Sequence, residues 1–588
     1  MKNSDIAAAF ELIADLLEFQ GANSFRVRAY RTAARTIHDL SEPIEKIDAD
    51  PDRKLTDIAG IGADLSIKIK SLLETGKIAM LDELQSQVPP SVLTLLRIPG
   101  MGPKKAAVLH KELGIKTLDD LRAACESHKV RELKGFGEKT EATIMAGLSF
   151  AGSKEIERMY WAEADGYATL LREHLQSCRS LKQLEMAGSY RRGRETIGDL
   201  DVLVVADDIN EVMDRLGTFD GIDTVLGRGE TKMSIRLGNG LQIDLRIVPP
   251  ESFGAALQYF TGSQAHNIVL RGMAKDRGLR INEWGVFKLD PKSKNDDPSE
   301  KSFKGKYIAG RTEEDVYATL DLPWIPPELR ENRGEFAWAE KKTLPKLVEL
   351  ADMQGDLHMH TTETDGKSTL EEMIAAAQER GLKYIAITDH SKRVSMANGL
   401  TADRLRRQWE QIDKINAALP GFKVLKGVEC DILEKGGMDI DDKCLSEADW
   451  VVASVHYGQN QPRDEITKRI VDALANPNVC AIAHPTGRII NRRKPYEVDM
   501  EAVYDAAVKY KKFLELNCNP ARLDLNDIQC ASCRERGIPI VISTDAHSTN
   551  GLAAMRYGLQ QARRAALTKE HVANTRSWEE VKKLLGKK

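Results

Sequence analysis

Most apolar runs after residue 350 end in a histidine, a carboxylate or an asparagine. Helical patterns separate these runs, which are KYIAITDH, KVLKGVECD, DWVVASVH, VCAIAHP, KFLELNCN and IPIVISTDAH. Strands that alternate with helices are typical of a parallel sheet or barrel, in which catalytic groups lie at the carboxyl ends of the strands. Core packing explains the apolar part of each run but not its polar end. The pattern therefore predicts a βα barrel with a functional site at one rim.

The polar ends of these strands are side chains that can bind metal ions. His358 and His360 stand two residues apart, so both face the same side of a strand, and Asp545 and His547 repeat this spacing. Six of the chain's twelve histidines lie at such strand ends, which structural core histidines do not explain. Histidine and carboxylate ligands without cysteine favour Zn²⁺, Mn²⁺ or Fe. A cluster of this size can hold two or three ions, enough to activate water and stabilise a phosphate leaving group.

Residues 348–575 resemble the PHP (polymerase and histidinol phosphatase) family through DLHMHTTETDG, ITDHS, GVECDI, SVH, AHPTGR and STDAHS. The resemblance implies a distorted barrel of seven βα units, a trinuclear metal site and phosphoester hydrolysis. All nine ligand positions carry suitable side chains, so we expect an active domain. These positions are His358, His360, Asp365, His390, Glu429, His456, His484, Asp545 and His547. Arg488 follows the AHP segment and is interpreted as a surface arginine, with binding of a substrate phosphate as the alternative.

Three carboxylates indicate a second site in the middle of the chain. Asp199 and Asp201 lie on one face of the apolar strand GDLDVLVVAD, and Asp244 interrupts the strand LQIDLRIVP. Neighbouring buried carboxylates repel each other unless a cation neutralises them. Two Mg²⁺ or Mn²⁺ ions are therefore expected, one to activate an attacking hydroxyl and one to hold a triphosphate and its leaving group.

The loop before these carboxylates has the residues that a triphosphate requires. Gly188 allows the backbone to come close to a phosphate, and Ser189 supplies a hydroxyl. Arg192 is expected to neutralise phosphate charge. The combination of GS, RRG and GDLD is typical of the nucleotidyltransferase superfamily.

The segment YFTGSQAHN makes the superfamily assignment more specific. With this segment included, residues 1–320 resemble a family X DNA polymerase. Fusion to a PHP domain is similar to the bacterial (PolX) branch of that family. The resemblance implies that Asp199, Asp201 and Asp244 are the catalytic metal ligands of the palm. It places Tyr259, Phe260 and Gly262 against the incoming sugar. It also implies that Asn267 contacts the base and that Arg271 faces the template strand.

Three glycine turns in the first 150 residues, GIG, GMG and GFG, each precede a helix. They fit helix–hairpin–helix modules, in which glycines let the backbone approach a DNA phosphate without reading sequence. The expected DNA-binding glycines are Gly60, Gly62, Gly100, Gly102, Gly135 and Gly137. This region has 21 Lys and Arg against 22 Asp and Glu, so any basic surface must be local.

Lys68 lies where eukaryotic relatives have the Schiff-base lysine that removes 5′-deoxyribose phosphate. Its surroundings depart from the pattern, because Asp64 and Ile67 stand where the relatives have a lysine and an acid. A lyase lysine needs a depressed pKa and aligned helper groups. Lyase catalysis and simple binding of a 5′-phosphate both remain open for Lys68.

Length and composition limit the remaining possibilities. A chain of 588 residues is too long for one domain. It has no run of about 18 apolar residues, so we expect no membrane span. Eight cysteines are too few for a disulfide scaffold and favour a reducing, cytoplasmic location. The formal net charge of −4 gives no indication of a nucleic-acid partner. We expect a monomer.

The motifs together predict a multidomain chain with helical, α+β and barrel parts. Its expected domains are a helical lyase-like domain with a helix–hairpin–helix motif (1–85), fingers with such motifs (86–150), a nucleotidyltransferase palm (151–250), a thumb (251–322), a linker (323–347) and a (βα)7 PHP barrel (348–588).

The leading hypothesis is a DNA polymerase that fills short gaps in base excision repair, using dNTPs on gapped or primer–template DNA. Its PHP domain would act as a metal-dependent 3′–5′ exonuclease, with AP-endonuclease and 3′-phosphatase activities left open. One alternative is a nucleotidyltransferase that acts on RNA or small molecules and carries a PHP phosphatase. Another is a scaffold that binds DNA ends without catalysis.

Overall fold

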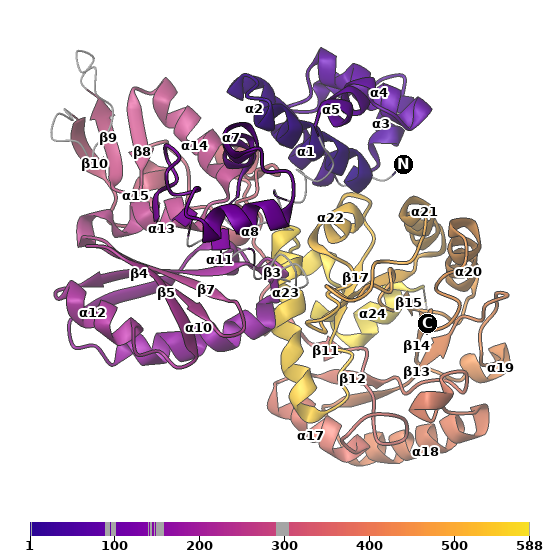
Figure 1. The fold of residues 1–588 in the computed structure, drawn as a ribbon. Coiled ribbons are helices and arrows are strands. Elements are labelled where there is room, and N and C mark those ends of the chain that lie inside the picture. The colour runs from indigo at the N-terminus through magenta and orange to yellow at the C-terminus, as the bar shows by residue number, and fades with distance from the viewer. Residues whose placement is uncertain are drawn as a thin grey trace. The chain divides into compact units, whose positions relative to one another are not determined.

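The chain folds into two compact units, Met1–Glu157 and Arg158–Lys588. The computed structural model describes residues 1, 3–40, 42–88, 95, 101–138, 140–141, 144–145, 148, 158–289 and 305–586. Figure 1 shows the succession of elements from helices, through a mixed sheet, to a parallel barrel.

The first unit is built from short amphipathic helices. They are α1 (Asn3–Phe19), α2 (Ser24–His38), α3 (Ile44–Ala49), α4 (Ala63–Thr75), α5 (Ala79–Gln87), α7 (Pro103–Leu113) and α8 (Leu118–Glu126), with a 3-10 helix η1 (Leu55–Asp57). Their apolar faces form two separate hydrophobic clusters, one from Ile6 to Val88 and one from Leu95 to Leu148. The fully buried side chains of each cluster come from one continuous segment, and Phe19 of α1 packs against both.

The second unit begins with a five-stranded mixed sheet in the order β2-β4-β7-β6-β5. Its strands are β2 (Leu181–Met186), β4 (Asp199–Ala206), β5 (Ile222–Arg228), β6 (Lys232–Leu237) and β7 (Gln242–Ile247), and a small pair is formed by β1 (Met159–Tyr160) and β3 (Thr196–Ile197). Helices α10 (Trp161–Gln176) and α12 (Ile209–Leu216) cover one face of the sheet (Figure 1).

Strand β4 alternates between two hydrophobic layers. Leu200, Val202 and Val204 pack under α10 and α12, whereas Leu203 and Val205 pack on the other side. Asp199 and Asp201 belong to the second set by their period of two, so they emerge on the face opposite α10 and α12.

A second subdomain follows the sheet. It has helices α13 (Phe253–Thr261), α14 (Gln264–Asp276) and α15 (Glu313–Ala318) and an antiparallel sheet of β8 (Leu279–Asn282), β9 (Gly285–Leu289) and β10 (Gly305–Ala309). The segment expected as a linker, 323–347, contains two helices. It forms a 3-10 helix η3 (Pro327–Leu329) and α16 (Glu335–Glu340), and buries Ile325, Leu329 and Phe336 in the same cluster as Tyr317. These apolar side chains complete the core of this subdomain.

The C-terminal part is a seven-stranded parallel sheet in sequence order, β11 to β17. The strands are β11 (Gly355–Asp356), β12 (Tyr384–Ile387), β13 (Lys423–Asp431), β14 (Trp450–Ser454), β15 (Ala481–Ile482), β16 (Phe513–Asn517) and β17 (Ile540–Ser543). The helices that follow them are α17 (Leu370–Glu379), α18 (Ala402–Ala418), α19 (Asp442–Leu445), α20 (Arg463–Ala475), α21 (Met500–Tyr510), α22 (Asp527–Glu535), α23 (Met555–Arg564) and α24 (Trp578–Leu584). A parallel bridge between Met359 and Ala546 joins the two ends of the sheet, as a barrel requires.

Alternate residues of the barrel strands face its inside and its helical outside. Ile385 and Ile387 pack with the helices, whereas Tyr384 and Trp450 pack with Trp578 of α24 in a separate cluster. Polar side chains occupy the carboxyl ends of the strands, as the sequence pattern predicted.

Candidate active sites

The three palm carboxylates lie on two adjacent parallel strands. In the register of β4 and β7, Asp201 stands directly opposite Asp244, and Asp199 precedes Asp201 on the same face. Ser234 and Gln242 donate hydrogen bonds to Asp244, the second at 3.0 Å. Parallel pairing thus brings together carboxylates that are more than forty positions apart in the sequence.

The pKa values show how strongly these carboxylates interact. Burial, followed by the charges of Asp199 and Asp244, raises the pKa of Asp201 to about 7. Burial and the charge of Asp244 also raise the pKa of Asp199. For Asp244 burial is outweighed by hydrogen bonds, first of all from Ser234, and its pKa is lowered. The triad therefore has an excess of negative charge, which a divalent cation would stabilise.

Gly188 lies directly against this triad. Its φ is +64°, and a Cβ there would overlap with Oδ2 of Asp201. Both the backbone conformation and the lack of space require glycine at this position.

We expect Gly188→Ala to lower nucleotide incorporation by about 100-fold, because a methyl group would displace Asp201 from its position in the carboxylate triad. Gly221→Ala is the matched control, since Gly221 has a φ of +80° but nothing within 4 Å of a Cβ. Single-turnover incorporation should separate the two variants. Equal losses in both would show that backbone strain, and not the contact with Asp201, determines the effect.

A cavity of about 770 Å³ opens beside the carboxylates. It gathers the residues that the sequence predicted for nucleotide binding, together with two of the carboxylates and Arg271: Gly188, Ser189, Arg192, Asp199, Asp201, Tyr259, Phe260, Gly262, Asn267 and Arg271. Sequence reasoning missed Arg158, Arg194, Gln264 and Ile268, which also line it. The two arginines add positive charge where a triphosphate is expected.

The side chains on α13 and α14 are held in defined positions. Asn267 donates from Nδ2 to the backbone oxygen of Tyr259 at 2.8 Å and accepts from Gln258 at 2.7 Å. The guanidinium of Arg246 stacks on the ring of Phe260, with 4.3 Å between Cζ and the ring centroid. These contacts shape one wall of the cavity.

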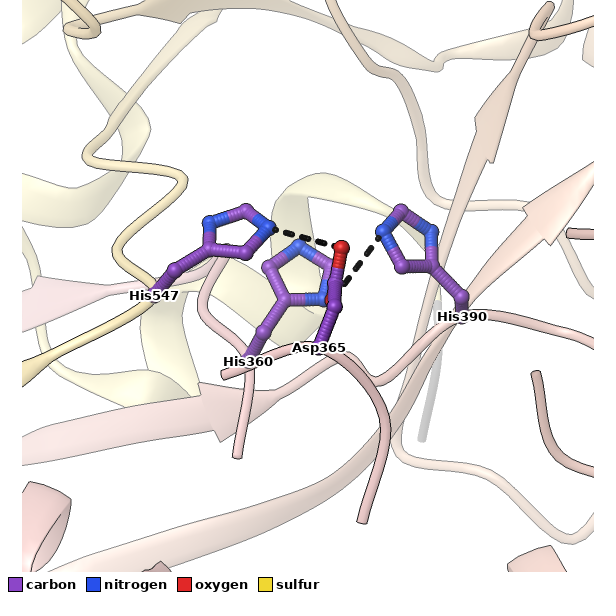
Figure 2. Close-up of side chains that lie close together, drawn as sticks. All are labelled: His360, Asp365, His390 and His547. Atoms are coloured by element: carbon purple, nitrogen blue, oxygen red, sulfur yellow. Dashed lines mark ion pairs between the residues drawn. The ribbon is translucent and has the colours of Figure 1, made fainter. Parts of the chain in front are cut away.

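At the barrel rim, the predicted metal ligands converge. Three overlapping groups have ligand atoms within 4.8 Å of one another: His360, Asp365, His390 and His547; His358, His360 and Asp545; and His390, Glu429 and His456. Figure 2 shows the first group, in which His390 and His547 approach Asp365 from opposite sides. Their Nε2 atoms lie 3.6 and 3.5 Å from the Asp365 oxygens.

Glu429 lies at the centre of the cluster. Its Oε2 is 2.8 Å from Nδ1 of His390 and 3.5 Å from Nε2 of His358. Its Oε1 is 3.1 Å from Nε2 of His484 and 3.4 Å from Nε2 of His456. The structure therefore brings all nine predicted residues together around Glu429.

These residues fit a group of divalent cations. Among the described residues, the buried atoms His358 Nε2, His360 Nδ1, His390 Nδ1 and Glu429 Oε2 have no well-oriented hydrogen-bond partner. Burial favours the neutral acid, yet His390, His456 and His358 hold the pKa of Glu429 well below its usual value. Buried, ionised carboxylates beside unpaired imidazole nitrogens are the donor set that hard and borderline cations prefer.

Two carboxylates behind the ligands were missed by sequence reasoning. Glu515 lies 2.7 Å from Nδ1 of His358 and accepts a 2.6 Å hydrogen bond from the backbone N–H of His484. Asp431 accepts from the backbone N–H of His456 at 2.9 Å and lies 3.1 Å from its Nδ1. Such carboxylates orient histidine rings and make them better metal ligands. Their position near the ends of β16 and β13 was the available signal.

Glu515→Gln should weaken metal binding by about 10- to 100-fold, because it removes the charge that orients His358 while keeping the shape of the side chain. Bound metal after dialysis and the Mn²⁺ concentration that gives half-maximal phosphoesterase activity would measure the loss. Glu501→Gln is the control, since Glu501 lies on α21 and forms an ion pair with Arg536 at the end of α22. Unchanged metal content in Glu515→Gln would contradict an orienting role.

Arg488 is buried, which corrects its interpretation as a surface arginine. Its side chain is 10% exposed and forms a 2.7 Å ion pair with Glu195. Glu195 follows residues 188–193, which are called the palm loop below. The pair satisfies a guanidinium that burial would otherwise destabilise. All eight cysteines are also buried thiols, including Cys530 and Cys533 of the CxxC sequence.

The first unit positions most of the predicted DNA-binding glycines at helix starts or in tight turns. Gly62 precedes α4, Gly102 precedes α7, and both have extended backbone angles. Positive φ angles occur at Gly60, Gly135 and Gly137. Gly100 lies outside the described residues. This arrangement is compatible with hairpins that expose backbone N–H groups.

Lys68 forms an ion pair with Asp64, with 2.5 Å between Nζ and Oδ1. The side chain of Lys68 is 17% exposed, and its Nζ lies 6.0 Å from the ring centre of Tyr30. The contact uses the amino group that a Schiff base would need, and no lysine or helper acid of the lyase pattern stands at Asp64 or Ile67.

Family models match five segments of the chain. They are a helix-hairpin-helix domain (1–78), a SAM-like helix-hairpin-helix tandem (92–149), the DNA polymerase beta palm (158–228), the DNA polymerase beta thumb (256–331) and the PHP domain (356–519). The DNA polymerase/3′-5′ exonuclease PolX of Bacillus subtilis is 40% identical over the whole chain and 99% of its own length. The chain is a member of the PolX family of DNA polymerases.

Two further relatives each match part of this PolX chain. A probable phosphatase of Thermoanaerobacter is 31% identical over 37% of the chain and 89% of its own length. DNA polymerase lambda of Rattus norvegicus is 26% identical over 56% of the chain and 56% of its own length. The polymerase and PHP domains of the PolX family imply dependence on divalent metal ions. Within the described residues, every helix is too short or too polar to cross a bilayer.

Proposed function

We propose that this chain fills short DNA gaps during base excision repair and trims 3′ ends with its PHP domain. The observation that carries the proposal is the presence of two separate, complete metal-compatible sites in one PolX chain. One is the palm triad beside a nucleotide-sized cavity, and the other is the histidine-rich rim of the barrel. Extension and trimming act on the same 3′ terminus, so their fusion is chemically coherent.

In the palm, Asp199, Asp201 and Asp244 would hold two Mg²⁺ or Mn²⁺ ions. Such ions lower the pKa of a primer 3′ hydroxyl and stabilise the pyrophosphate leaving group. Ser189 and Arg192 would bind the triphosphate, and Tyr259 and Phe260 would exclude water beside the sugar. The location of these residues around one cavity supports this assignment.

Three further contacts are proposed around the same cavity. Gly262 would let the backbone pass close to the sugar, Asn267 would contact the base of the incoming dNTP, and Arg271 would face the template strand. The exposure of Arg271 at the edge of the cavity supports the last of these roles.

In the barrel, the nine rim residues would hold two or three Mn²⁺, Zn²⁺ or Fe ions. Bound ions of this kind supply a metal-activated hydroxide and neutralise the phosphate that is attacked. A 3′–5′ exonuclease is the activity we propose first, because the full-length relative carries that name. AP-endonuclease and 3′-phosphatase activities use the same chemistry, and the Thermoanaerobacter relative is named a probable phosphatase.

The substrates would be gapped or primer–template DNA and dNTPs, and we propose a cytoplasmic monomer. Gly60, Gly62, Gly100, Gly102, Gly135 and Gly137 would contact DNA phosphates through the backbone. Lys68 is assigned to binding of a 5′-phosphate, since Asp64 and Ile67 stand where the lyase pattern has a lysine and an acid. A Schiff-base lyase role for Lys68 is the second candidate, which borohydride trapping on a 5′-deoxyribose phosphate end would test.

One assay tests the proposal as a whole. Purified protein is incubated with a labelled one-nucleotide gap, with and without dNTPs, in Mg²⁺ or Mn²⁺. We expect one-nucleotide extension with dNTPs and stepwise 3′ shortening without them. Incorporation of rNTPs in preference to dNTPs, or no metal-dependent activity of either kind, would contradict it.

A further inference from the structure

Helix α23 of the PHP domain lies against the palm loop that carries the expected triphosphate ligands. Gln561 donates from Nε2 to the backbone oxygen of Gly193 at 2.9 Å. Arg564 donates from Nη1 to the backbone oxygen of Arg192 at 2.8 Å. The loop and the helix are more than 360 residues apart in sequence. Figure 1 shows α23 between the barrel and the palm elements α11 (Gly188–Arg191) and β3.

A buried carboxylate connects the same two arginines through their side chains. Oε1 of Glu331 accepts from Nε of Arg192 at 3.0 Å and from Nη1 of Arg564 at 2.9 Å. The exposed fraction of the side chain is 9% for Glu331, 12% for Arg192 and 2% for Arg564. Asp527 of the barrel accepts from Nε of Arg564 at 3.0 Å and so fixes the other edge of that guanidinium.

These contacts determine the direction of the Arg192 side chain. Its Nη1 donates to the backbone oxygen of Thr261 at 2.5 Å, and the side chain lines the cavity. Arginine has many rotamers, and fixing one of them costs side-chain entropy unless neighbouring groups hold it. Glu331 holds the side chain of Arg192 and Arg564 holds its backbone. A loss of Arg564 would loosen both attachments at once.

We infer that α23 of the PHP domain is a structural part of the polymerase site, where Arg564 and Gln561 position Arg192 for the phosphates of the incoming nucleotide. This inference rests on the proposed role of Arg192 in nucleotide binding. Arg564 and Gln561 are positioning residues, because they contact the loop and not the cavity.

Other ion pairs hold the PHP domain to the rest of this unit without contacting the palm loop. Arg563, the neighbour of Arg564 on α23, pairs with Glu328 at 2.7 Å and donates to the backbone oxygen of Val348. Arg563→Ala therefore removes the same charge from the same helix and leaves the contacts of Arg192 intact. It is a matched control for Arg564→Ala.

The experiment measures kcat and KM for the correct dNTP on a one-nucleotide gap with the full-length variants. Arg564→Ala should raise the KM for dNTP by about tenfold, with a smaller change in kcat, because a misdirected Arg192 weakens phosphate binding. Arg563→Ala should stay within about twofold of the parent. Arg564→Lys should recover part of the loss by restoring a donor. Metal-dependent phosphoesterase activity should be unchanged in all three.

Several outcomes decide between a positioning role and simple docking. Equal KM effects in Arg564→Ala and Arg563→Ala would overturn the inference, as would an unchanged KM in Arg564→Ala. If Arg564→Ala does not fold, Gln561→Leu removes only the bond to Gly193 and should still raise KM. Arg192→Ala tests the underlying assignment. If it leaves KM unchanged, the proposed role of Arg192 fails; if it alone raises KM, only the role of α23 fails.

Discussion

Replacing Asp199 and Asp201 together by alanine should lower nucleotide incorporation by about a thousandfold or more and leave phosphoester hydrolysis intact. Each carboxylate would hold ions that activate the attacking hydroxyl and stabilise the leaving group, and such effects amount to several kcal/mol. The barrel rim uses a different set of ligands, none of which lies on β4. The expected result is therefore a clean separation of the two activities.

Primer extension and 3′ shortening on the same labelled gap measure both activities of the double variant. Asp207→Ala is the control, because Asp207 follows the other end of β4 and its exposed side chain pairs with Lys182. Extension by the double variant at more than about one per cent of the parental rate would exclude these carboxylates as the essential metal ligands.

The melting temperature of the double variant separates a loss of catalysis from misfolding. Because the folded state raises the pKa of Asp201 from 3.8 to about 7, the stability of the metal-free protein falls as the pH rises between these values. Removal of this carboxylate should therefore stabilise the metal-free fold at pH 8 and have less effect at pH 4. Melting temperatures at both pH values check the sign, and a large loss of stability at pH 8 would contradict it.

The sequence predicted which residues lie together in the cavity and at the barrel rim because these residues follow local periodic patterns. His358 and His360, or Asp199 and Asp201, share a strand face by their spacing alone. Parallel strands then bring the ends of separate runs together, which explains why Glu429 meets His484 as expected. No knowledge of distances was needed for these predictions.

The contacts between domains could not be predicted in this way. The pairs Arg488–Glu195 and Arg564–Glu331 join residues 293 and 233 positions apart. Each of these residues lies in a polar segment that local patterns assign to the surface. Their burial follows from the packing of the barrel against the palm and thumb, which no periodicity describes. Glu515 was not predicted for a related reason, because nothing in the local sequence distinguishes it from other acids inside strands.

Replacing His358 and His360 together by alanine should lower metal-dependent phosphoester hydrolysis by about a thousandfold, while gap filling continues. His360 belongs to two of the three ligand groups, and His358 lies 3.5 Å from the central Glu429. The loss of both imidazoles therefore affects more than one ion. It also removes His358 and His360 from Asp545, whose pKa they hold well below its usual value, whereas Glu429 keeps His390 and His456.

His571→Ala is the matched control for the histidine pair. His571 belongs to the same domain but lies in a 3-10 helix, where its Nδ1 contacts Thr568. Metal content, hydrolysis of p-nitrophenyl phosphate and 3′ shortening of DNA should all fall in the double variant and stay near parental values in the control. Because the small phosphoester needs no DNA contact, it reports the chemistry of the rim alone. Shortening of DNA that survives in the double variant, with hydrolysis of the small phosphoester lost, would place the nuclease outside the barrel rim.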